Sequence, residues 1–141
     1  MPSRRGIATV EFALITPLFL LLLAGVLDYT QLMRAAIAVA DAARAGAQYG
    51  SLSIANASNL AGMQTAAANA APDINGLQTS AAKVCKCSDG TTVNCTGGTC
   101  STGPVRTYVQ VAAWVSFTPI FSYSQVPFGG SVLSTASMRA Q

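Results

Sequence analysis

The spacing of apolar residues changes twice along the chain, and the first pattern is a continuous apolar run. Residues 12–27 contain no charged side chain, and extending the run back to Ile7 gives 21 residues. Only three polar residues interrupt it: Thr9, Glu11 and Thr16. Because about 20 apolar residues span the hydrocarbon core of a bilayer, residues 7–27 are predicted to form a transmembrane segment.

The second pattern is an apolar stripe at helical spacing, which continues beyond the run. The stripe consists of Leu32, Ala36, Val39, Ala40, Ala43 and Ala47. After the apolar run no strong helix breaker occurs before Gly50, and residues 28–49 are rich in alanine, the best helix former. One helix over residues 7–49 would be about 65 Å long, roughly twice the bilayer core. Residues 28–50 are therefore predicted to extend the helix outside the membrane.

Three further expectations concern this long helix. Pro17 is expected to kink it, because proline removes one backbone hydrogen bond and crowds the preceding turn. The alanine-rich stripe favours packing against a sheet, and the alternative is close approach of two helices, which small residues permit in membranes. Asp41 and Arg44 are spaced to form an i,i+3 ion pair, worth a few tenths of a kcal/mol.

The third pattern has a period of two and predicts strands. Apolar and polar side chains alternate along residues 105–117, and further strands are expected over residues 79–87 and 132–139. A short helix is expected over residues 60–71, where Pro72 follows. Residues 51–141 are thus predicted to form an extracytoplasmic domain, with three or four antiparallel strands packed on the outer half of the long helix. The expected fold class is α+β.

Composition narrows the possible chemistry. Only 9% of the 141 residues are charged, against roughly 25% in an ordinary domain, and histidine is absent. A His-based catalytic triad or metal site is therefore excluded, the acidic residues are scattered, and no enzyme activity, cofactor or metal is predicted. The net charge of +3 is too small to predict specific nucleic-acid binding. Lys83, Lys86 and Arg106 are interpreted as a solvated basic edge rather than a DNA or surface contact.

The orientation of the predicted transmembrane segment follows from the charged residues before it. Arg4 and Arg5 directly precede it, so the positive-inside rule keeps the N-terminus in the cytoplasm and sends the rest outward. A secretory signal peptide is the alternative, since it also has a basic start and an apolar core. Glu11 argues against it, because a carboxylate within an apolar segment is costly and indicates a function.

Four cysteines lie within the outer domain: Cys85, Cys87, Cys95 and Cys100. Their spacing does not fit a zinc site, and the outward topology places them in an oxidising compartment, so two disulfides are predicted. Three pairings are possible from sequence. The nested one, Cys87–Cys95 inside Cys85–Cys100, suits a hairpin.

The residues around the start of the apolar run resemble the processing site of type IV prepilins. A basic leader ends in Gly6, Glu11 follows five residues later, and Phe12 comes next. The resemblance implies that residues 1–6 are a leader removed by a prepilin peptidase, which leaves Ile7 as the first residue. Glu11 would then be the fifth residue of the mature chain, able to pair with the new α-amino group of its own chain or of a neighbour.

The resemblance extends over roughly residues 4–50 and is to the TadE-like family, the pseudopilins of tight-adherence (Tad/Flp) pilus systems. It is carried by the 10–15 segment with Pro17 and the leucine run, by Asp28-Tyr29, and by the 42–49 segment. It implies a minor pilin of the bacterial inner membrane that acts in pilus assembly and adhesion, with other pilins and pilus assembly proteins as partners. Two alternatives stay open: a membrane-anchored assembly factor that never enters the filament, and a secreted binding domain behind a signal peptide.

Overall fold

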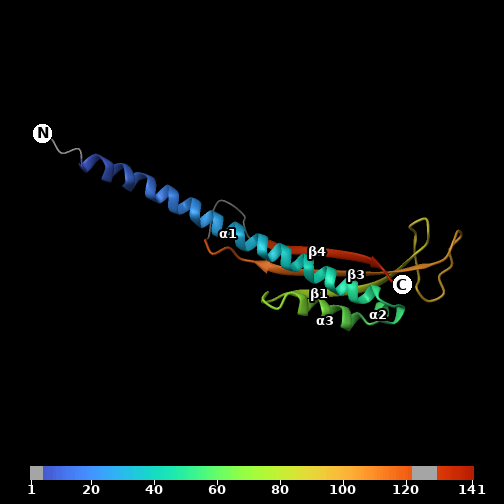
Figure 1. The fold of residues 1–141 in the computed structure, drawn as a ribbon. Coiled ribbons are helices and arrows are strands. Elements are labelled where there is room, and N and C mark those ends of the chain that lie inside the picture. Colours follow the sequence, from blue (N-terminus) through green and yellow to red (C-terminus); the bar gives the residue numbers. More distant parts are fainter. Residues whose placement is uncertain (1–4, 122–129) are drawn as a thin grey trace.

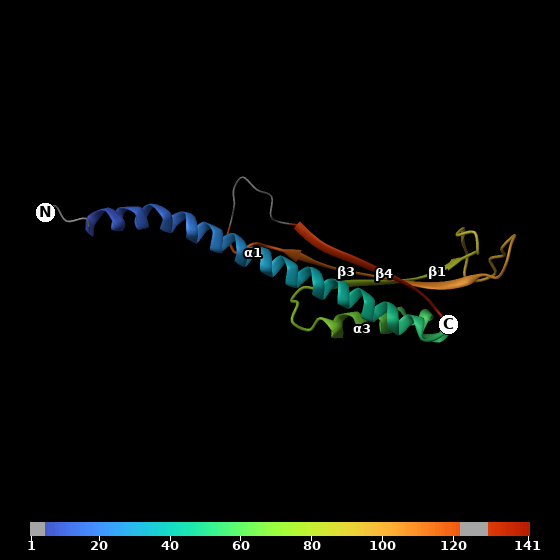
Figure 2. The same ribbon diagram turned by 45° about the horizontal axis from the view of Figure 1, so that its top comes forward.

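One helix dominates the molecule in the computed structural model, which describes residues 5–121 and 130–141. Helix α1 spans Arg5–Ser51 and runs through Pro17 without interruption. Figure 1 shows its C-terminal half lying along a sheet, while its N-terminal half projects away from the rest of the protein. Figure 2 shows that the helix axis curves in the projecting half, where Pro17 lies. Thr16 next to Pro17 donates its hydroxyl hydrogen to the Phe12 carbonyl, at 2.7 Å.

Two short helices follow α1 and are started by capping side chains. The hydroxyl of Ser53 accepts from the Asn56 N–H at the start of α2, Ile54–Ser58, and the Asn59 side chain accepts from the Gly62 N–H at the start of α3, Leu60–Ala70. Such caps satisfy backbone donors that the helix leaves free. The expected helix over residues 60–71 is confirmed as α3, whereas α2 was not predicted, because five residues are too few to display a helical period.

Four antiparallel strands form one sheet in the order β2-β1-β3-β4. Their bounds are Gln78–Lys86 for β1, Thr92–Val93 for β2, Arg106–Phe117 for β3 and Gly130–Arg139 for β4. The three long strands match the predicted ones, and the fold is α+β as expected. Residues 122–129, which include Tyr123 and Phe128, lie outside the described residues.

The core lies between the sheet and the outer half of α1, with α3 along its side. Alternate residues of β3 point into it, among them Val109, Val111 and Ala113, which are fully buried. They meet the small face of α1, where Val39, Ala43 and Ala47 have no exposed surface. The alanine-rich stripe therefore packs against the sheet, because small side chains let the helix backbone come close to it.

Gly46 marks a close approach of backbone to backbone within this core. A Cβ atom at this position would lie 2.8 Å from the backbone oxygen of Met63 and 2.9 Å from a methyl group of Val111. Any side chain larger than hydrogen would have to displace backbone on α3. Gly46 thus fixes the distance between α1, α3 and β3.

The two disulfides are present, but their pairing is crossed rather than nested. Cys85 bonds to Cys95 and Cys87 bonds to Cys100, with Cα–Cα distances of 5.2 and 5.6 Å. The nested expectation was wrong because the strand register places Val93 opposite Cys85, so that Cys95, two residues on, remains beside Cys85. The chain then turns, with the Gly98 N–H donating to the Asn94 carbonyl, and returns toward Cys87.

Candidate functional site

The projecting half of α1 presents apolar side chains on every side. Phe12 and Leu14 are each 73% exposed, and Leu18, Leu21 and Val26 are each 61% exposed. Among the described residues this is the one helix long and apolar enough to cross a membrane, and none of its most apolar window is buried in the protein. In water such a surface would be unfavourable by about 25 cal/mol per Å². The segment is therefore consistent with a membrane anchor.

The residues of the expected processing site lie at the start of this helix. Gly6 and Ile7 are in the first turn of α1, and Glu11 and Phe12 follow one turn later with exposed side chains. The first part of the expected leader, residues 1–4, lies outside the described residues. Glu11 is about 6 Å along the axis from Ile7, so it is within reach of an amino group created at Ile7.

A second carboxylate stands at the opposite end of the apolar run and was missed by sequence reasoning. Asp28 is only 4% exposed. Its two carboxylate oxygens accept hydrogen bonds from the backbone N–H groups of Ile120, at 2.9 Å, and Phe121, at 3.4 Å. Figures 1 and 2 both show this segment, just after β3, lying beside α1 where the helix leaves the outer domain. The signals in the sequence were the position of Asp28 directly after the apolar run and its place among the residues that carry the family resemblance.

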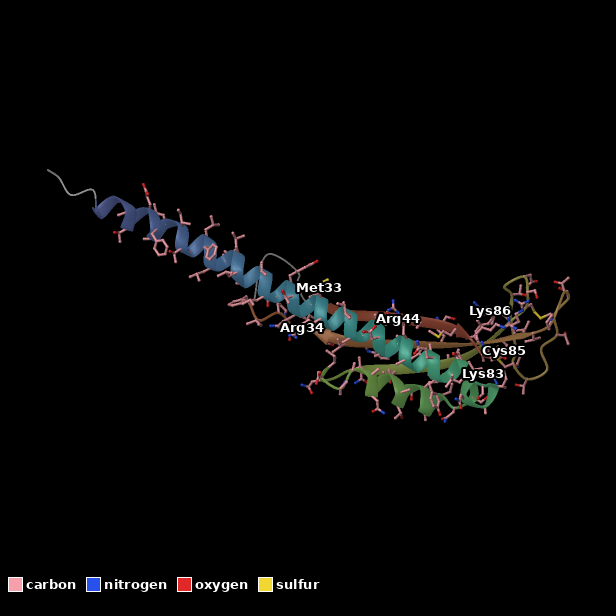
Figure 3. All side chains as sticks on the ribbon, in the orientation of Figure 1. Met33, Arg34, Arg44, Lys83, Cys85 and Lys86 are labelled. Atoms are coloured by element: carbon pink, nitrogen blue, oxygen red, sulfur yellow. A yellow bond between two sulfur atoms is a disulfide. The ribbon has the colours of Figure 1, made fainter. Side chains whose placement is uncertain are left out.

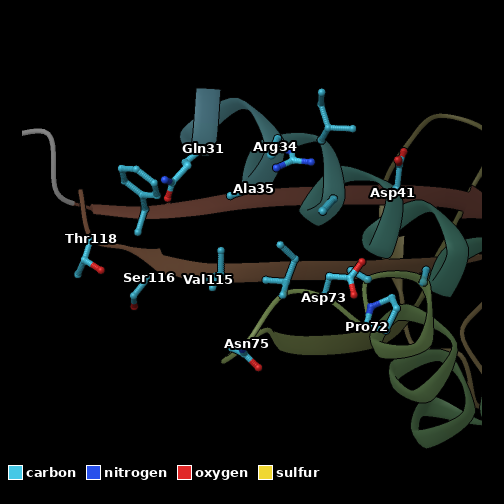
Figure 4. Close-up of a pocket in the computed structure, with 16 residues that line it drawn as sticks. Gln31, Arg34, Ala35, Asp41, Pro72, Asp73, Asn75, Val115, Ser116 and Thr118 are labelled. Atoms are coloured by element: carbon cyan, nitrogen blue, oxygen red, sulfur yellow. The ribbon is translucent and has the colours of Figure 1, made fainter. Parts of the chain in front are cut away.

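An open groove of about 920 Å³ lies between α1, the segment after α3 and the end of β3. Arg34 and Asp41 line it from α1, and Asp73 lines it from the segment after α3, as Figure 4 shows. Asp41 and Arg44 form the predicted i,i+3 pair, at 3.7 Å. The groove is polar at its rim and holds one cation against two carboxylates, so it has no strong preference for a charged ligand.

The disulfide-linked loop forms the far end of the molecule. Figure 3 shows Cys85, Lys83 and Lys86 at the end opposite the projecting helix. Lys86 lies beside Arg106 across the β1–β3 ladder, and its ammonium is 6.0 Å from the centre of the Tyr108 ring. Lys83 instead donates to the hydroxyl of Ser58 at 3.0 Å. The three basic residues therefore do not converge on one point.

The turn between β1 and β2 contains an acidic residue, Asp89, whose pKa is lowered. The Asp89 carboxylate accepts hydrogen bonds from the hydroxyl and from the backbone N–H of Thr91. These bonds stabilise the charged form, so the pKa of Asp89 is lowered from its ordinary value. Gly90 completes the turn with a φ of 87°, a conformation that favours glycine.

Residues 5–121 and 130–141 contain no cluster of three Cys, Asp or Glu side chains that could hold a metal ion. The four cysteines are consumed in disulfides. The features with functional meaning are therefore the apolar helix, the two carboxylates at its ends and the outer domain.

Comparison with known proteins agrees with the resemblance seen in the sequence. The family model for TadE-like protein matches residues 6–48, a segment that begins at the expected cleavage site and lies within α1. No curated protein and no solved structure matches the chain significantly. The family match covers less than a third of the chain and shows that this segment is similar to TadE-like proteins.

Proposed function

From the match of residues 6–48 to the TadE-like family, we propose that this chain is a minor pilin that acts in the assembly of a tight-adherence pilus. A prepilin peptidase removes residues 1–6 on the cytoplasmic side of the inner membrane. Residues 7–27 then hold the protein in the membrane, residues 28–50 extend the helix outward, and residues 51–141 form the extracytoplasmic domain. From this position the protein enters, primes or caps a filament.

One observation supports this proposal above all. The matched family segment coincides with a single unbroken helix whose first half has no covering within the protein and whose second half is a central part of the core. Such a helix serves as membrane anchor before assembly and as filament core afterwards. A cleavable signal peptide has no need to continue as the same helix into the folded domain.

Glu11 carries the assembly step in this proposal. A carboxylate inside hydrocarbon is costly, and pairing it with the α-amino group at Ile7, largely protonated at neutral pH, lowers that cost. If the amino group belongs to a neighbouring subunit, the pair sets the axial register between two helices. Filaments carrying Glu11→Ala should then assemble poorly, while Glu11→Asp should retain part of the function. Unchanged assembly of the alanine variant, measured by cross-linking of purified filaments, would reject this role.

The cleavage step is tested by a pair of glycine variants in the same helix. Gly6→Val should abolish the loss of residues 1–6, because the resemblance places the cut directly after Gly6. Gly25→Val is the matched control, since a Cβ atom at Gly25 meets nothing within 4 Å. The masses of the two membrane-extracted proteins should differ by the leader. Equal processing of both would contradict the proposal.

The alternative of an assembly factor that stays in the membrane shares the anchor and differs in its final location. Sheared and washed pili should contain the protein if it is a filament component. Its retention in the membrane fraction, with pili that form normally only when it is present, would favour the assembly factor.

A further inference from the structure

The base of the outer domain has an apolar surface that the proposed function does not use. It consists of Tyr29, Ile120 and Phe121, which we call the base patch. Tyr29 is 58% exposed, Ile120 58% and Phe121 43%. Tyr29 lies on α1 next to Asp28, and the two others lie on the segment after β3 whose backbone Asp28 binds, so all three residues lie near the same level of α1. Exposed apolar side chains gathered at one level indicate a binding surface.

The backbone N–H groups of the base patch have hydrogen-bond partners within the protein, as a loop in contact with lipid requires. Pro119 has no N–H group, so Asp28 accepts from every backbone donor of residues 119–121. A loop in water needs no such partner, because water satisfies its donors. In lipid each free donor would cost several kcal/mol. Burying a carboxylate to satisfy two consecutive amide groups is therefore of most use if the loop contacts lipid.

The position of the base patch along α1 also fits contact with lipid. Asp28 is the first residue after the expected membrane segment, so the patch lies where α1 leaves the hydrocarbon core. Tyrosine and tryptophan side chains are enriched at this level of membrane proteins. Arg34 is exposed about 9 Å further along the helix, and helical side chains tilt toward the N-terminus. Its guanidinium can therefore reach back toward lipid phosphates.

We propose that the base patch docks the outer domain on the outer surface of the membrane, with Ile120 and Phe121 immersed at the lipid headgroup boundary and Asp28 satisfying the backbone donors above them. The occupant is lipid because Tyr29 closely follows the exposed apolar side chains of Val26 and Leu27 on α1, at the end of the expected membrane segment. This inference rests on the proposed membrane insertion of residues 7–27. It adds that the outer domain is held against the bilayer before assembly, rather than swinging freely on the helix.

Tryptophan fluorescence tests the inference with the full chain in phosphatidylcholine vesicles. Phe121→Trp places a probe in the base patch, Leu20→Trp places one in the expected membrane segment, and the natural Trp114, within β3, supplies the signal outside the membrane. Each protein is measured with and without lipid brominated near the headgroup end of its acyl chains. The emission that Phe121→Trp adds should shift to the blue and be quenched by the brominated lipid, while Trp114 emission in the unmodified chain should be unchanged.

The outcomes separate this inference from the proposed function. Quenching of the Leu20→Trp probe without quenching of the Phe121→Trp probe would overturn docking and leave the membrane anchor intact. A blue shift of the Phe121→Trp probe without quenching would mean contact with a second copy of the chain, and would also overturn lipid docking. Absence of quenching at both positions would overturn docking and membrane insertion together. Ile120→Trp is the second probe if Phe121→Trp fails to fold.

Discussion

The carboxylate of Asp28 accepts a hydrogen bond from the backbone N–H of Ile120, 2.9 Å away and 92 positions later in the chain. This bond, with its neighbour from Phe121, joins the end of the apolar run within α1 to the segment that follows β3. The outer domain is thereby fixed to α1 at its base as well as along the core. The orientation of the domain relative to the projecting helix depends on this contact.

Removing the Asp28 carboxylate should destabilise the outer domain. Asp28→Ala leaves two backbone donors without their acceptor, which costs about 1–3 kcal/mol. Asp28→Asn keeps one acceptor oxygen and should recover part of the loss. Chemical unfolding followed by Trp114 fluorescence measures the difference. Asp41→Ala is the control on the same helix, because its carboxylate is 58% exposed and its ion pair is worth about 1 kcal/mol or less. Equal stability of Asp28→Ala and Asp41→Ala would contradict the structural role.

Adding a side chain at Gly46, where α1 meets the backbone of α3, should also be costly. Gly46→Ala places a Cβ atom 2.8 Å from the Met63 backbone oxygen, and overpacking of this kind costs about 1–3 kcal/mol. Gly25→Ala, in open space on the same helix, should not destabilise, since alanine favours a helix by roughly 1 kcal/mol over glycine. Thermal unfolding of both variants in one detergent compares them. A Gly46→Ala protein as stable as the Gly25→Ala protein would show that α1 and α3 can move apart freely.

Peptide mapping without reduction should find the crossed disulfides. Trypsin cuts after Lys86 and so separates Cys85 from Cys87. The fragment that contains Cys85 should remain linked to Cys95, and tandem fragmentation between Cys95 and Cys100 should place Cys100 on Cys87. A link from Cys85 to Cys100 would restore the nested pairing and contradict the register of β1 and β2.

The carboxyl group of Asp89, in the turn between β1 and β2, should have a pKa below its ordinary value. Thr91 stabilises the charged form of Asp89, so the folded pKa is lowered and the associated stability is present at neutral pH. That stability is lost as the pH falls from the ordinary carboxyl pKa through the folded value. Thr91→Val removes the hydroxyl donor and should raise the pKa of Asp89 toward its usual value, measured by NMR titration of the carboxyl carbon. An unchanged pKa in Thr91→Val would show that the hydroxyl bond has no role.

Much of the fold was accessible from the sequence, because its patterns are local. The alternating pattern of β3 and the alanine stripe of α1 each indicate which side chains are buried, and those side chains lie in the core. The crossed disulfides were not accessible, because strand register and the Asn94–Gly98 turn decide which sulfur atoms meet. The role of Asp28 was missed because its partners are backbone groups of residues 120 and 121, and backbone donors leave no mark in a sequence. The roles of Gly6, Ile7 and Glu11 stay predictions, because each role depends on the removal of residues 1–6.

The proposed function requires that the apolar helix is kept after the leader is removed. N-terminal sequencing of the protein extracted from membranes of a producing bacterium shows whether it is kept. We expect the chain to begin at Ile7, with Glu11 as its fifth residue. A chain that begins near Asp28 would show that the apolar segment is a signal peptide, and would overturn the proposal of a minor pilin.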